Sequence, residues 1–141
     1  MIGAFYSFLE SVGFEHPLHP ILVHFAVGMI VGALVFALIA WLGARPQLYT
    51  TARHAINFGI VAYILTVLMG FADWIHFYGS AWIFPIQMKI ILAAVLLPLL
   101  LVAYYLNKQA KSDSKILLGV YALSAVDVII VGFFGAELVY G

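Results

Sequence analysis

The chain contains no cysteine, few charged residues and no low-complexity linker. The missing cysteines exclude disulfides, thiolate metal sites, c-type haem attachment and cysteine nucleophiles, although they indicate nothing about redox compartment. Charged residues make up 9% of the chain, whereas a soluble domain usually carries about 25%. A formal net charge of zero offers no electrostatic attraction for nucleic acid, so no nucleic-acid partner is expected. Without a linker or a long repeat, residues 1–141 are predicted to form one membrane domain.

The chain also lacks the motifs of several enzyme and carrier classes. It has no phosphate-binding loop, no nucleophile elbow and no Ser/His/Asp arrangement. It also has no discontinuous inverted repeat of the kind that builds transporters. We therefore do not expect a hydrolytic enzyme or a carrier, and a non-enzymatic role is favoured.

Apolar residues dominate what is present, at 66% of the chain with a mean hydropathy of +1.14. Four long apolar segments cover about residues 20–42, 54–77, 82–106 and 116–140. Roughly 20 apolar residues in a helix cross a bilayer, and each segment reaches that length. Short connections make neighbouring helices antiparallel. The predicted fold class is all-α: an integral-membrane, up-and-down four-helix bundle whose first partner is the lipid bilayer.

A short amphipathic helix is predicted ahead of the bundle, over residues 2–13. One face of it carries the apolar side chains Ile2, Phe5, Tyr6, Leu9 and Val12. The segment is too short to span a bilayer, so the membrane interface is its expected place. It lacks a basic first region and a cleavage site, and so it does not resemble a signal peptide.

The basic residues predict the orientation of the bundle. Two connections on the same side carry five of the six: Arg45, Arg53, Lys108, Lys111 and Lys115. Such residues favour the cytoplasmic side, which places both termini outside. This topology gathers an outer polar layer from all four helices: His16, His19, His24, Asp73, His76, Lys89, Glu137 and Tyr140.

A b-type haem is the first hypothesis for this layer. His24 has Gly28 and Gly32 on nearly the same helix face, which leaves a flat slot for another helix or for a planar macrocycle. His76 is the best second axial ligand by predicted depth, and Asp73 could orient a neighbouring imidazole. The alternative is that the histidines bond backbone carbonyls and interfacial water. For His16 and His19 we favour this alternative.

A divalent metal is a second possibility, with His16 and His19 as ligands together with His24 or Glu137. The spacing matches no strong zinc signature, because the prolines between the histidines break the helical geometry that such motifs use.

Lys89 and Asp127 are the two ionisable residues predicted deeper in the membrane. An unpaired charge there costs at least ~2.5–3.5 kcal/mol, so a Lys89–Asp127 pair is the economical prediction. The pair is interpreted as a lock between helices, with a proton relay or a quinone-headgroup site as the functional alternative. Glu137 is the other candidate partner for Lys89.

Three short motifs resemble those of a widespread prokaryotic family of four-span membrane proteins of unknown function. They are His-Pro-Leu-His-Pro-Ile-Leu-Val-His-Phe at 16–25, Gly-Phe-Ala-Asp-Trp at 70–74 and Gly-Ala-Glu-Leu-Val-Tyr at 135–140. Some members of that family are fused to Rieske-type iron–sulfur or cytochrome domains, so the resemblance implies a link to electron transfer. Two departures are that Gln87-Met88-Lys89 stands where the family often has a histidine, and that the His-Gly tail after the tyrosine is missing.

These observations lead to three hypotheses of function. The first is a small membrane protein of a respiratory or photosynthetic electron-transfer assembly that holds or borders haem b, with a redox partner protein. The second is a cofactor-free accessory subunit of a larger membrane complex. The third is a proton or small-molecule pathway through Lys89 and Asp127. The expected location is the prokaryotic cytoplasmic membrane.

Overall fold

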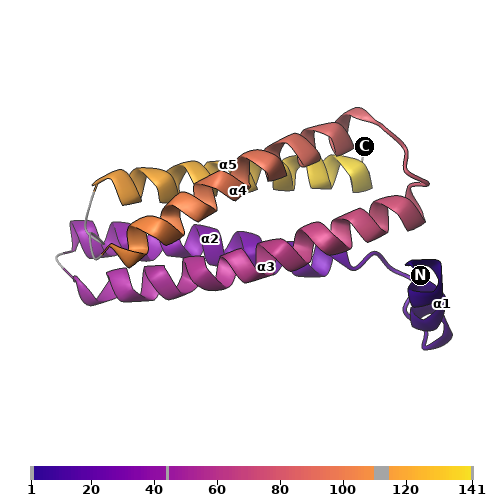
Figure 1. The fold of residues 1–141 in the computed structure, drawn as a ribbon, viewed down its shortest axis with the longest axis horizontal. Helices are drawn as coiled ribbons and strands as arrows, with labels where there is room; N and C mark the ends of the chain where they lie inside the picture. Colours follow the sequence, from indigo (N-terminus) through magenta and orange to yellow (C-terminus); the bar gives the residue numbers. More distant parts are fainter. Residues whose placement is uncertain (1, 44, 110–114, 141) are drawn as a thin grey trace.

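The computed structural model describes residues 2–43, 45–109 and 115–140, with side chains up to residue 138. In this part of the chain the elements are α1 (Ile2–Ser11), α2 (His19–Leu42), α3 (Gln47–Phe77), α4 (Phe84–Lys108) and α5 (Lys115–Tyr140). Figure 1 shows α2 to α5 side by side, with α1 set apart at the end where both termini lie. The predicted all-α bundle preceded by a short helix is confirmed.

Four of the described helices are long and apolar enough to cross a membrane: α2, α3, α4 and Lys115–Leu138 of α5. Many of their large apolar side chains point away from the bundle and are exposed, for example Phe25, Leu68, Leu101 and Phe133. A surface of this kind needs lipid around it. The protein is therefore a multi-pass membrane protein whose helices are embedded in a lipid bilayer.

The helix boundaries differ from the prediction most at the start of α3, which begins at Gln47 and not near residue 54. Hydropathy marks only the apolar part of a helix, whereas the helix itself continues through polar residues such as Thr50 and Arg53. α4 begins at Phe84 because Ile83 is extended and Pro85 fits the first turn, where a helix needs no N–H.

α1 ends in a turn that requires glycine. The N–H of Phe14 donates to the carbonyl of Leu9 (2.9 Å), and the N–H of Gly13 donates to the carbonyl of Glu10 (3.0 Å). This pair of bonds is a Schellman motif, and Gly13 has the left-handed φ of 86° that the motif needs. The turn ends α1 and leads the chain toward the start of α2.

The bundle consists of two tightly packed pairs, α2 with α3 and α4 with α5, which join mainly through α2 and α5. α2 meets α3 closely at Gly59, where an added Cβ would lie 3.1 Å from Cγ1 of Ile30. Small residues let membrane helices approach in this way. Two ends are named below: the α1 end, and the basic end that carries Arg45, Arg53 and Lys108.

Candidate functional site

A buried carboxylate, Asp73 of α3, lies at the centre of the α1 end, and its side chain is 3% exposed. It accepts hydrogen bonds from the hydroxyl of Tyr6 and from the backbone N–H groups of His19 (2.8 Å) and Leu18 (3.3 Å). The first N–H groups of a helix lack partners within the helix, and Leu18 offers no side-chain cap to α2. Asp73 therefore caps α2 from a neighbouring helix, with its charge at the positive end of the helix dipole.

Tyr6 brings α1 into the same junction. Its side chain is 2% exposed, stacks on His76 at 4.2 Å and meets Phe77 edge to face at 5.3 Å. Glu10, one turn further along α1, has a carboxylate oxygen 3.5 Å from Nε2 of His76. Burial raises the pKa of Tyr6 well above its ordinary value, and the hydrogen bond to Asp73 and the charge of Asp73 raise it further. Tyr6 therefore remains a protonated donor over the physiological pH range.

His19 ties the start of α2 to α3 through its ring. Nδ1 lies 3.0 Å from the carbonyl oxygen of Thr66. A carbonyl can only accept, so Nδ1 donates, and Nε2 carries no proton in the neutral ring. Gly70 makes room for this ring, because a Cβ at position 70 would lie 2.7 Å from Nδ1 of His19. His19 thus makes the bond to a backbone carbonyl that the sequence analysis favoured.

Gly70→Ala is expected to lower the free energy of unfolding by about 1–3 kcal/mol, because the new methyl group displaces the ring of His19 from Thr66. Gly132→Ala is the matched control, since an added Cβ at that helical glycine meets nothing within 4 Å. Thermal unfolding in detergent, followed by circular dichroism, compares the two variants. Equal midpoints would contradict the placement of His19 against Gly70.

Lys89 lies toward this junction and forms no ion pair with Asp127, so the predicted pair is wrong. The described residues hold no ion pair between the two, and Lys89 instead interacts electrostatically with Asp73 and His19. Its Nζ lies 3.9 Å from the position of a Cβ on Gly135. Asp127 is eight residues from Gly135, roughly 12 Å deeper along α5, which exceeds the reach of a lysine side chain. The register of α5 against α4 therefore separates the two side chains.

Two other residues of the predicted outer layer, Glu137 and His16, take no part in this junction. Glu137 is exposed on α5 and forms no ion pair with any described residue, so it does not replace Asp127 as the partner of Lys89. His16 is exposed in the bend before α2, where its ring meets Phe14 edge to face at 6.1 Å. The side chain of Tyr140 lies outside the described residues.

His24, Gly28 and Gly32 lie on a lipid-facing side of α2. His24 is exposed, and its Nδ1 bonds the carbonyl of Pro20 one turn earlier in the same helix. A Cβ added at Gly28 or Gly32 meets nothing within 4 Å. Gly28 and Gly32 are therefore open on this side, and no part of the described chain covers them.

The haem hypothesis pairs His24 with His76, and the structure does not bring these residues together. The contact between His19 of α2 and Gly70 of α3 shows which levels of the two helices match. His24 lies five residues deeper in the bundle than this level, and His76 lies six residues nearer the α1 end. The two histidines are therefore separated by roughly 16 Å along the bundle. Axial ligands of one iron must face each other at one level. The residues of this chain alone do not fit a bis-histidine haem. Nor does the described part of the chain contain a cluster of three or more potential metal ligands.

The basic end contains a polar cluster that the sequence analysis did not single out. The hydroxyl of Tyr121 donates to Oδ1 of Asn107 (3.0 Å), and both side chains are buried. Nδ2 of Asn107 and Nε of Arg53 are buried without a hydrogen-bond partner. Polar residues at expected helix ends look solvent-exposed in a sequence, so only their position near the basic loops could have indicated this cluster.

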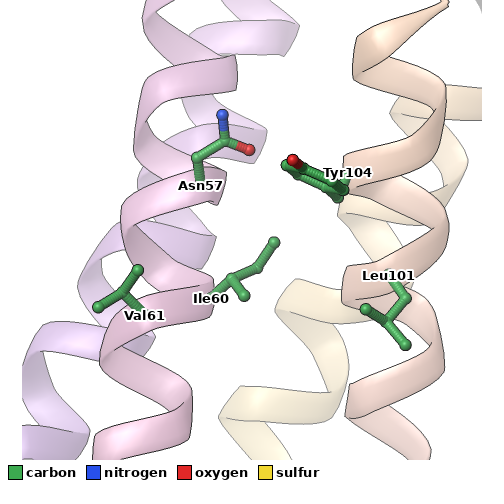
Figure 2. A pocket seen from close by; sticks show the side chains of 5 residues that line it. All are labelled: Asn57, Ile60, Val61, Leu101 and Tyr104. Carbon is green, nitrogen blue, oxygen red and sulfur yellow. The ribbon is translucent and has the colours of Figure 1, made fainter.

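A groove runs between α3 and α4 on the basic-end side, and these two helices are the least closely packed neighbours among the four spans. Its volume is about 360 Å³, and its walls are mainly apolar, formed by Ile60, Val61 and Leu101. Figure 2 shows Asn57 and Tyr104 pointing toward one another across it. The groove is lateral and faces the lipid, away from the junction around Asp73.

Comparison with known proteins gives one informative match. A search of curated proteins and a search of solved structures each returned no significant match. A family model described as "Predicted membrane protein (DUF2231)" matches residues 15–141. This range holds the three motifs on which the resemblance rests, and the structure brings His19, Gly70 and Gly135, one from each motif, to the α1 end. The chain belongs to the DUF2231 family of membrane proteins of unknown function.

Proposed function

We propose that the protein is a cofactor-free accessory subunit of a larger membrane assembly. The observation that carries this proposal is the three-donor junction at Asp73, which joins α1, α2 and α3. His19 and His76 are engaged in the same structural contacts, with Thr66 and with Tyr6 and Glu10. The polar groups of this layer therefore hold the helices and the interfacial helix in place, which is the task of a scaffold.

The lipid-facing slot on α2 is the proposed docking face for a helix of a partner subunit. Gly28 and Gly32 let a second backbone approach, and the exposed imidazole of His24 lies beside them. Nε2 of His24 is available for a hydrogen bond across such an interface, where small and polar residues together favour helix association.

Electron transfer is the proposed function of the whole assembly, in line with the Rieske and cytochrome domains fused to some relatives. Redox groups are expected in the partner subunits, because the histidines of this chain do not fit haem by themselves. A pathway through Lys89 and Asp127 is not favoured, since these residues form no pair. The proposed location is the prokaryotic cytoplasmic membrane, with Arg45, Arg53 and Lys108 on the cytoplasmic side.

Gly28→Leu is expected to release the protein from its native assembly, because the larger side chain fills the slot on α2. Gly119→Leu on α5 is the matched control, since both glycines are exposed and an added Cβ meets nothing within 4 Å at either. The measurement is native gel electrophoresis of solubilised membranes with detection of the tagged protein. Loss of the high-mass band in Gly28→Leu alone supports the docking face, and an unchanged band contradicts it.

An absorption spectrum of the purified protein, oxidised and reduced, tests the cofactor-free part of the proposal. We expect no Soret band after growth with added haem precursor. A Soret band that disappears in His24→Ala or His76→Ala would overturn this part of the proposal and restore the haem hypothesis.

A further inference from the structure

A second buried aspartate, Asp127, lies far from both ends of the bundle. It is twelve residues from the start of α5 at Lys115, so roughly 18 Å along the helix axis. Its side chain is 6% exposed. A short carboxylate at this depth cannot extend to the interface as lysine or arginine does. Asp127 therefore has to be accommodated inside the bundle.

Among the described residues, no donor or cation pairs with Asp127 to favour its charged form. Its Oδ2 is buried without a hydrogen bond, and no ion pair in the described part of the chain involves it. Asp73 is equally buried but accepts three hydrogen bonds. An ionised carboxylate without donors costs several kcal/mol in a membrane interior, at least ~2.5–3.5 kcal/mol on insertion scales. The two buried aspartates thus differ in what surrounds them, although both lie within helices of the same bundle.

The groups around Asp127 supply no cation. On α3, Tyr63 is close enough to interact electrostatically, but its hydroxyl donates to the carbonyl of Ala93 on α4 (2.8 Å). On α5 itself, the hydroxyl of Ser124 donates to the carbonyl of Val120 (2.9 Å). Both hydroxyl protons are therefore directed to backbone oxygens and away from the carboxyl group.

The cations and histidines of the other packed helices lie elsewhere. On α4, Lys89 interacts with Asp73 and His19. On α2, the titratable residues are His19 and His24, both in the first turns at the α1 end, and the buried residues further in are Ala26, Ile30, Ala33, Ala37 and Ala40. On α3, Arg53 interacts with Tyr121 toward the basic end.

We propose that Asp127 is a proton-binding site in the centre of the bundle, held as a neutral carboxylic acid at neutral pH, whereas Asp73 is the ionised structural aspartate. The site goes beyond the accessory function, because it gives the membrane-embedded part of the protein one exchangeable proton. It does not depend on a partner subunit and can be tested on the purified protein.

Infrared spectroscopy of the protein in a detergent without ester groups tests this proposal. A protonated carboxyl absorbs above the amide bands, and the wild-type protein is expected to show such a band at neutral pH. Aspartate labelled in its side-chain carboxyl carbon should shift the band, and the chain has only three aspartates, Asp73, Asp113 and Asp127. Asp127→Asn should abolish the band, and Glu137→Gln, an exposed acid on the same helix, should retain it.

A wild-type spectrum without an aspartate-derived band would overturn the proposal, and this result needs no variant to fold. A band that survives in Asp127→Asn would also overturn it. The accessory function is tested independently, because these spectra are recorded on the isolated chain and the assembly is measured in native membranes.

Discussion

Asp73→Ala is expected to destabilise the protein by about 3–5 kcal/mol, because it removes the shared acceptor of three donors at once. The hydroxyl of Tyr6 is buried and cannot turn to water, and the first N–H groups of α2 lose the cap that Asp73 provides. The expected result is a lower unfolding midpoint in detergent together with fraying at the start of α2. Hydrogen exchange measured by mass spectrometry should locate the fraying at residues 18–22.

One further substitution separates the loss of the hydrogen-bond acceptor from the loss of the charge, and a second serves as a control. Asp73→Asn keeps one carbonyl oxygen at the site, so it should retain part of the lost stability. Glu137→Ala removes an exposed carboxylate and should leave the midpoint unchanged. If Asp73→Ala behaved like Glu137→Ala, the junction would not be what holds α1, α2 and α3 together.

Composition and topology predicted the bundle, because four apolar segments with short connections leave few other arrangements. They also predicted that His19, Asp73 and Lys89 share one end, since antiparallel order fixes which ends meet. The order does not say which residues touch at that end. The cap that Asp73 provides to α2 depends on side-chain directions at the helix ends, and no sequence signal shows these.

The sequence could not indicate two properties of the helices. One is the register of α4 against α5, and the other is the rotation of α2 about its own axis. Lys89 and Asp127 were placed within reach of each other, but the actual register of α4 and α5 puts Lys89 near Gly135, two turns away from Asp127. His24 was expected in the polar layer, but it is exposed on the side of α2 that faces lipid. A helix that is apolar all round carries no periodic signal that distinguishes its lipid face from its packed face. The sequence could therefore fix the depth of His24 but not its direction.

The sequence prediction for α1 has a similar limit. Its amphipathic pattern predicted α1 and placed Tyr6 on the apolar face. What the pattern could not indicate is that Tyr6 is also a hydrogen-bond donor to a carboxylate distant in sequence. This bond makes α1 a docked element of the structure, which its amphipathic pattern alone does not predict.

Tyr6→Phe is therefore expected to undock α1 while leaving the four spans folded. A hydrogen bond to a charged group contributes about 1.5–3 kcal/mol, so its loss should raise the undocked population roughly 10- to 100-fold. The ring contacts of residue 6 with His76 and Phe77 remain possible in the variant. Any change then reports the hydrogen bond to Asp73 and not the loss of packing.

The absence of cysteine makes this prediction directly measurable, because two introduced cysteines are the only reactive thiols. Spin labels at Ser11→Cys on α1 and Ile75→Cys on α3 occupy exposed positions on the two docked helices. A narrow distance distribution is expected in the wild-type background and a broad one in Tyr6→Phe. Tyr105→Phe, which removes an exposed hydroxyl of α4, should keep the narrow distribution. A narrow distribution in Tyr6→Phe would mean that stacking on His76 and the contact between Glu10 and His76 suffice to hold α1, and that Asp73 serves α2 alone.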